Sequence, residues 1–189
     1  VLVLPQWERA SSTVYDLLVG HEVGHALYTP DENWIKYKKI PPQFVNVVED
    51  ARIEKLMKRK YAGLSKTFYR GYKELNDEDF FAISDSDVTD FNLADRANLY
   101  FKIGNFLNLK FTEEEMAIIR MIEGCDTFDE VLFAAEVLYK FCKKEKEEKV
   151  DDMPMPPGEM GGESDEPSSV FVEAEQQEDA PSEGSGDSG

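Results

Sequence analysis

Cysteine is scarce in this 189-residue chain, which contains only Cys125 and Cys142 and no C-x-x-C spacing. The scarcity argues against both a disulfide framework and a thiolate zinc site, and indicates two reduced, packed thiols in a cytoplasmic protein. For a viral chain this would be the host cytoplasm. No apolar run reaches the ~18 residues that a spanning helix needs, and no signal peptide is recognisable, so no membrane partner is expected.

Positive charge is absent from the last part of the chain. Residues 150–189 hold twelve Asp or Glu and no Lys or Arg, so they supply −12 of the net charge of −18. An acidic balance repels phosphate groups, and no nucleic-acid partner is expected. Because this part is also rich in Pro, Gly and Ser, we predict one domain over residues 1–149 and a disordered acidic linker or tail over 150–189. The abrupt start at Val1 further suggests a piece of a longer chain.

Hydrophobic periodicity predicts a mainly α-helical (α+β) domain. Val1 to Leu4 are apolar and end at Pro5, which predicts a short edge strand. Thr13 is the expected N-cap of the first helix. Residues 64–93 mix aromatic and Asp-rich stretches without a clear period and are predicted to be mostly loop. The predicted helices span residues 12–28, 41–61, 93–107, 113–123 and 128–147, the last two preceded by capping-box patterns.

The chain's only two histidines stand four residues apart in His21-Glu22-Val23-Gly24-His25. On a helix they project from one face, one turn apart, where both imidazoles can bind one Zn²⁺. Glu22 is rotated by about 100° from His21, so its carboxylate would lie beside a zinc-activated water and act as general base. Two hydrogen-bonded core histidines are the structural alternative, but chance would produce this pattern only about once in a thousand such chains.

A zinc site of this kind needs a third protein ligand and an open fourth position. With no further histidine and neither cysteine nearby, the third ligand must be a carboxylate. Glu49 lies on the apolar stripe of Val45 and Ile53, where a carboxylate is costly to bury unless it is paired or binds metal. We therefore predict Glu49 as the third ligand, with Asp50 as the alternative.

Other polar residues of the same region could support the site. Glu54 could orient a histidine through its Nδ1–H group, or instead form an exposed ion pair with a neighbouring lysine. Arg52 could pair with Glu49 or with another carboxylate of the site. A tyrosine commonly stabilises the oxyanion in such enzymes, and the sequence does not choose among the candidates. These are Tyr28, Tyr37, Tyr69 and Tyr72.

About the first third of the chain resembles the zincin-like domain of cobaltochelatase CobT-type proteins and related phage and bacterial metallopeptidases. The matching segments are Leu2-Val3-Leu4-Pro5, His21-Glu22-Val23-Gly24-His25-Ala26-Leu27-Tyr28-Thr29-Pro30 and Val48-Glu49-Asp50-Ala51-Arg52-Ile53-Glu54. In that family an acidic linker and a von Willebrand factor A domain commonly follow, and an AAA+ ATPase is the partner. The acidic tail fits that linker, but no Asp-x-Ser-x-Ser adhesion motif is present.

These observations lead to three functional expectations. The first is a zinc-dependent hydrolase, most simply a metallopeptidase acting on a protein or peptide substrate. The second, implied by the resemblance, is a non-proteolytic CobT-like chelatase or assembly subunit that binds metal and works with an AAA+ ATPase. A phage-encoded accessory protein with an unknown target is a third, weaker interpretation.

Overall fold

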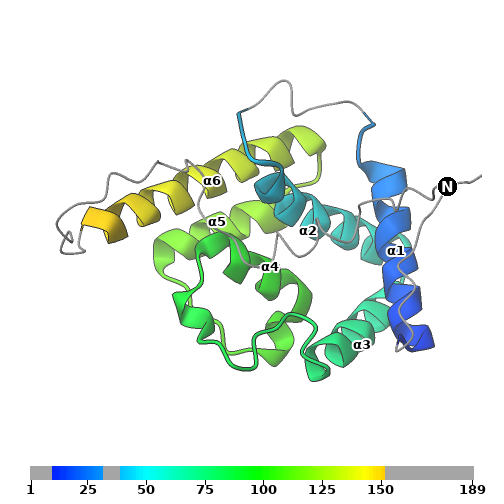
Figure 1. The fold of residues 1–189 in the computed structure, drawn as a ribbon. Helices are drawn as coiled ribbons and strands as arrows, with labels where there is room; N and C mark the ends of the chain where they lie inside the picture. Colours follow the sequence, from blue (N-terminus) through cyan, green and yellow to red (C-terminus); the bar gives the residue numbers. More distant parts are fainter. Residues whose placement is uncertain (1–9, 32–38, 152–189) are drawn as a thin grey trace, which may run out of the picture.

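A computed structural model describes residues 10–31 and 39–151, and these are mainly helical, as the sequence predicted (Figure 1). The helices are α1 (Ser12–Tyr28), α2 (Pro42–Lys60), α3 (Leu64–Asp77), α4 (Leu93–Ile103), α5 (Glu113–Gly124) and α6 (Phe128–Asp151), with short 3₁₀ turns η2 (Val88–Asp90) and η3 (Gly104–Phe106). No strand occurs within the described ranges. The predicted strand at residues 1–4 and the predicted tail beyond residue 151 lie outside them. No helix in the described part is both long and apolar enough to cross a membrane.

Two local predictions were wrong. Residues 64–77 form α3 rather than loop, because Phe68, Tyr72 and Leu75 recur at helical spacing and are buried on one face. Exposed aromatic side chains such as Tyr69 obscured that spacing. The N-cap of α1 is Ser11 rather than Thr13, since the Ser11 hydroxyl accepts a hydrogen bond from the Val14 amide at 3.1 Å.

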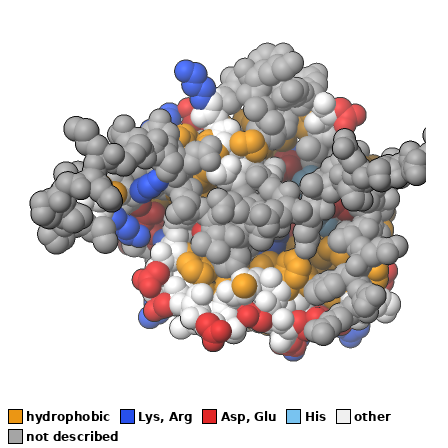
Figure 2. Space-filling view, in the orientation of Figure 1, with side chains coloured by type: hydrophobic (Ala, Val, Ile, Leu, Met, Phe, Trp, Pro, Cys, Tyr) orange, Lys and Arg blue, Asp and Glu red, His pale blue; other side chains and the backbone are white. Residues whose placement is uncertain are grey.

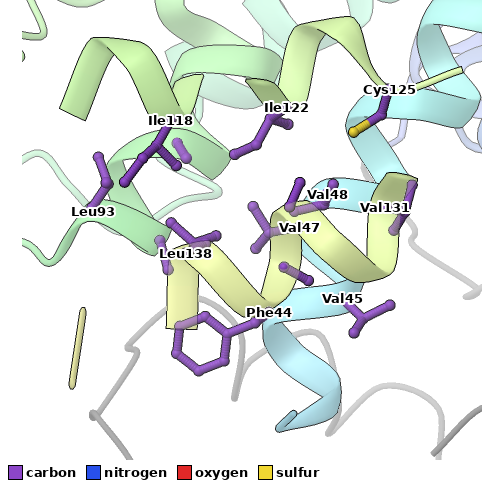
Figure 3. Close-up of a cluster of buried hydrophobic side chains, with 14 of the residues drawn as sticks. Phe44, Val45, Val47, Val48, Leu93, Ile118, Ile122, Cys125, Val131 and Leu138 are labelled. Atoms are coloured by element: carbon purple, nitrogen blue, oxygen red, sulfur yellow. The ribbon is translucent and has the colours of Figure 1, made fainter. Parts of the chain in front are cut away.

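The larger apolar core joins α2 to α4, α5 and α6. Figure 3 shows Phe44 and Val48 of α2 facing Leu138 of α6, with Ile122 of α5 and Leu93 of α4 closing the cluster. All five side chains are at most 1% exposed. Helix α2 is thereby fixed along one side, so its remaining faces are held in a defined orientation toward α1.

A second core joins α1, α3 and α4 through Val14, Leu17, Phe68 and Ile103. Helix α2 contacts all five of the other α-helices and lies between the two cores. Its approach to α1 is close at Gly24, where an added Cβ would lie 2.9 Å from Ile53 Cδ1. The contact places the histidine-bearing helix directly against the acidic segment of α2.

Packing between α1 and α3 depends on Gly71. A Cβ at this position would lie 2.6 Å from Leu17 Cδ1 and 2.9 Å from Leu17 Cβ. Gly71→Ala should therefore lower the free energy of unfolding by ~1–2 kcal/mol, because overpacking outweighs the helix propensity gained. Urea denaturation measures this change. Gly124→Ala is the matched control, since nothing lies within 4 Å of its added Cβ, and it should leave stability unchanged or slightly raised.

Candidate metal centre

His21 and His25 of α1 and Asp50 of α2 bring one ligand atom each to a common point. His25 Nε2 lies 3.1 Å from His21 Nε2 and 3.0 Å from Asp50 Oδ1. His21 Nε2 lies 3.4 Å from the same Asp50 oxygen. These three are the only group of at least three metal-binding side chains found in the described part of the chain. Pale-blue histidine atoms reach the surface of the face drawn in Figure 2.

The spacing of these atoms fits a small tetrahedral cation. Ligand atoms bound at about 2.0–2.1 Å to tetrahedral Zn²⁺ lie about 3.3 Å from one another. The three observed separations of 3.0, 3.1 and 3.4 Å bracket that value. Two imidazole nitrogens and one carboxylate oxygen are also a ligand set found in zinc sites that keep a fourth position open.

Hydrogen bonds behind the two rings fix which nitrogen carries the proton. His21 Nδ1 lies 2.9 Å from Glu54 Oε1, an acceptor, so Nδ1 is the protonated nitrogen. His25 Nδ1 lies 2.8 Å from the Thr29 hydroxyl, which itself donates to Glu49 Oε1 at 2.8 Å and therefore accepts from His25. In this neutral tautomer each ring presents the Nε2 lone pair that a metal ion requires. Without a metal ion, protons must lie among the three atoms, and His21 Nε2–H can donate to Asp50 Oδ1.

The carboxylates around the cluster favour a positive charge at His21, which a proton or a metal ion can supply. Burial alone would lower the pKa of His21, but the carboxylates of Asp50 and Glu54 outweigh it and raise that pKa to about 10. Burial would raise the pKa of Asp50, yet His21 and Lys102 hold it well below its ordinary value. Asp50 is thus ionised at neutral pH and available as a metal ligand.

Glu49, the preferred third ligand from the sequence, lies outside the cluster. Its carboxylate accepts hydrogen bonds from Arg52 Nε at 3.0 Å and Arg52 Nη2 at 2.6 Å, and its side chain is only 3% exposed. Asp50, the alternative, lies with the two histidines instead. Both buried carboxylates have a partner that compensates their burial, and for Glu49 that partner is Arg52. Arg52 also donates to the Tyr28 carbonyl at 2.8 Å.

Glu54 contacts His21 Nδ1, so the interpretation of Glu54 as a partner for a histidine is confirmed over the exposed ion pair with a lysine. Its carboxylate is buried against His21 Nδ1 and also accepts a short hydrogen bond from the Tyr72 hydroxyl. Lys55 instead pairs with Asp126. Of the candidate tyrosines, Tyr72 therefore donates its hydroxyl to the carboxylate that holds His21. Tyr69 is 51% exposed, and Tyr37 lies outside the described residues.

Glu22 lies on the exposed side of α1, between the two histidines in sequence. It makes no hydrogen bond or ion pair with any other residue that the structure describes. Its carboxylate is exposed to solvent, which is compatible with the general-base role that the motif predicts.

Thr29 is a residue of the candidate site that the sequence interpretation missed. Its hydroxyl connects His25 Nδ1 to Glu49, which is held in turn by Arg52. A hydroxyl four residues after a histidine, at the C-cap of the same helix, was the available signal. The three residues Thr29, Glu49 and Arg52 form a continuous polar chain behind the ligand.

Removing the Thr29 hydroxyl should weaken metal binding. Thr29→Val keeps the shape of the side chain but leaves the His25 Nδ1–H group without its acceptor, and zinc affinity should fall ~10–100-fold. Competition with a chromogenic chelator measures this affinity. Thr29→Ser keeps the hydroxyl and should retain most of it. Equal affinities in the two variants would show that the hydroxyl does not orient His25.

Comparison of the chain with known families, curated proteins and solved structures found no match. The proposed function therefore rests on the geometry of His21, His25 and Asp50.

Proposed function

We propose that this protein is a zinc-dependent hydrolase, most simply a metallopeptidase. The observation that carries the proposal is the convergence of His21 Nε2, His25 Nε2 and Asp50 Oδ1 within 3.0–3.4 Å of one another, with Glu22 in the same helical turn.

Each residue has a separate task in this proposal. His21, His25 and Asp50 hold the zinc ion, which when bound supplies Lewis-acid activation of water and of a substrate carbonyl. Glu22 accepts the proton of the attacking water and passes it to the leaving nitrogen of the peptide bond. Glu54 and Thr29 keep the two imidazole rings in the orientation and tautomer that zinc binding requires.

The proposed substrate is a protein or peptide, and the proposed setting is the cytoplasm, or the host cytoplasm for a viral chain. The two cysteines are unpaired and buried, which is compatible with a reducing compartment. The alternative is a non-proteolytic CobT-like subunit that uses the same metal cluster and works with an AAA+ ATPase.

Cleavage of an unfolded polypeptide separates the two functions. The purified chain with one equivalent of zinc should release fragments from a fluorescently labelled, unfolded protein. A chelator should stop the release, and added zinc should restore it. His25→Ala, which removes one ligand, is the control for contaminating proteases. One bound zinc per chain without cleavage of unfolded protein or of a peptide library would contradict the peptidase and favour the alternative.

A further inference from the structure

Lys102 brings a buried positive charge against the ligand Asp50. It lies in the last turn of α4, its side chain is 6% exposed, and its Nζ atom lies 3.2 Å from Asp50 Oδ2. Taking an ammonium group out of water is costly unless a negative group compensates it. The Asp50 carboxylate supplies such a negative group to Lys102.

The two oxygens of Asp50 have separate partners. Oδ1 lies within 3.4 Å of both histidine Nε2 atoms, whereas Oδ2 lies against Lys102 Nζ. The position of Lys102 is well defined, because the neighbouring Leu99 and Ile103 of α4 are fully buried in the second core. Lys102 thus approaches Asp50 from a rigid helix on the side away from the histidines.

A carboxylate can bind a metal ion through one oxygen or through both. Binding through both would take up an additional coordination position, and a catalytic zinc needs that position for water or substrate. We infer that Lys102 is a positioning residue that keeps Asp50 a one-oxygen ligand, so that the three protein ligands fill three coordination positions of the zinc ion and leave the fourth open. This inference rests on the proposed metal site and adds a residue from a third helix to it.

The electronic spectrum of the cobalt-loaded protein tests this role without measuring activity. Co²⁺ in a four-coordinate site absorbs visible light more strongly than in a five-coordinate one, because geometry determines the intensity. Lys102→Met should bind one Co²⁺ per chain but lose visible absorption, as Asp50 Oδ2 becomes free to coordinate. Lys102→Arg should keep the wild-type spectrum, because the guanidinium can also donate a hydrogen bond to Asp50 Oδ2. Zinc-supported kcat of Lys102→Met should fall ~10–100-fold, with a smaller change in KM.

Lys110→Met is the matched control, because it makes the same substitution at an exposed position shortly after α4, and it should leave the spectrum unchanged. If Lys102→Met does not fold, X-ray absorption of the zinc-loaded wild type decides the question. Four nitrogen or oxygen neighbours support the inference, and five contradict it. An unchanged spectrum in folded Lys102→Met would overturn the role of Lys102 but not the proposed metal site. A wild-type chain that binds neither cobalt nor zinc would overturn the proposed function as well.

Discussion

Replacing Glu22 with glutamine is expected to abolish hydrolysis while leaving metal binding intact. Glutamine has nearly the same shape as glutamate but cannot accept a proton from water, and loss of a general base lowers kcat ~10²–10⁴-fold. Glu22 is exposed and lies outside the His21, His25 and Asp50 cluster, so zinc stoichiometry and the melting temperature should stay at wild-type values. Steady-state cleavage, with metal analysis of the same sample, measures both quantities.

Glu147→Gln is the control for this experiment. It makes the same change on an exposed helical surface of α6, remote in sequence from the motif, and should retain full activity. Turnover by Glu22→Gln at the rate of this control would remove Glu22 from the mechanism. Loss of zinc from Glu22→Gln would instead mean that Glu22 is a ligand, which contradicts the arrangement described above.

Asp50→Asn and Glu49→Gln each break a buried ion pair and should both lower stability, but they should differ in their effect on zinc affinity. Asp50→Asn replaces a charged ligand by a neutral one. One ligand contributes ~3 kcal/mol to the binding free energy of a zinc site, so zinc affinity should fall by at least about a hundredfold. Glu49→Gln breaks the buried ion pair with Arg52 and should lower the free energy of unfolding by ~3 kcal/mol. Zinc affinity of the folded Glu49→Gln protein should fall by only about tenfold, because Glu49 acts on His25 indirectly, through its hydrogen bond with the Thr29 hydroxyl.

Calorimetric zinc titration and urea denaturation, carried out on both variants, measure the two effects separately. Titration is done at a temperature where each variant is folded. The reverse result, with zinc binding lost in Glu49→Gln and kept in Asp50→Asn, would return the ligand role to Glu49. Equal losses of affinity in both would mean that neither carboxylate is distinguished as the ligand.

Part of this site could be predicted because its signals are local. The spacing of His21 and His25 is a property of one helix, and it places both imidazoles on one face wherever that helix lies. Glu54 could likewise be named as a partner for a histidine, because a metal-binding imidazole needs an acceptor at Nδ1. The capping box at Thr112 and Glu115 also formed as its pattern predicted.

The choice between Glu49 and Asp50 could not be made from the sequence. Both are buried, and the helical pattern of α2 shows which side chains leave water without showing what they face. That depends on how α1 crosses α2, which is set by the close contact at Gly24 and by the core on the other side of α2. Lys102 lies 52 residues after Asp50, and no local pattern connects the two.

Helix α3 could not be predicted from the sequence for the same reason. Phe68, Tyr72 and Leu75 form a buried face on α3 only because α1 and α4 supply a surface for them. In the sequence, the exposed Tyr69 beside the buried Phe68 hides that face. Tertiary packing therefore determines both the helix that sequence periodicity missed and which of the two carboxylates lies beside the histidines.

The number of zinc ions bound per chain tests the central claim most directly. Protein prepared without chelator and dialysed against a known free-zinc concentration should contain one zinc per wild-type chain and none per His25→Ala chain. A wild-type chain that retains no zinc, or a His25→Ala chain that retains as much as the wild type, would contradict a metal centre at His21, His25 and Asp50.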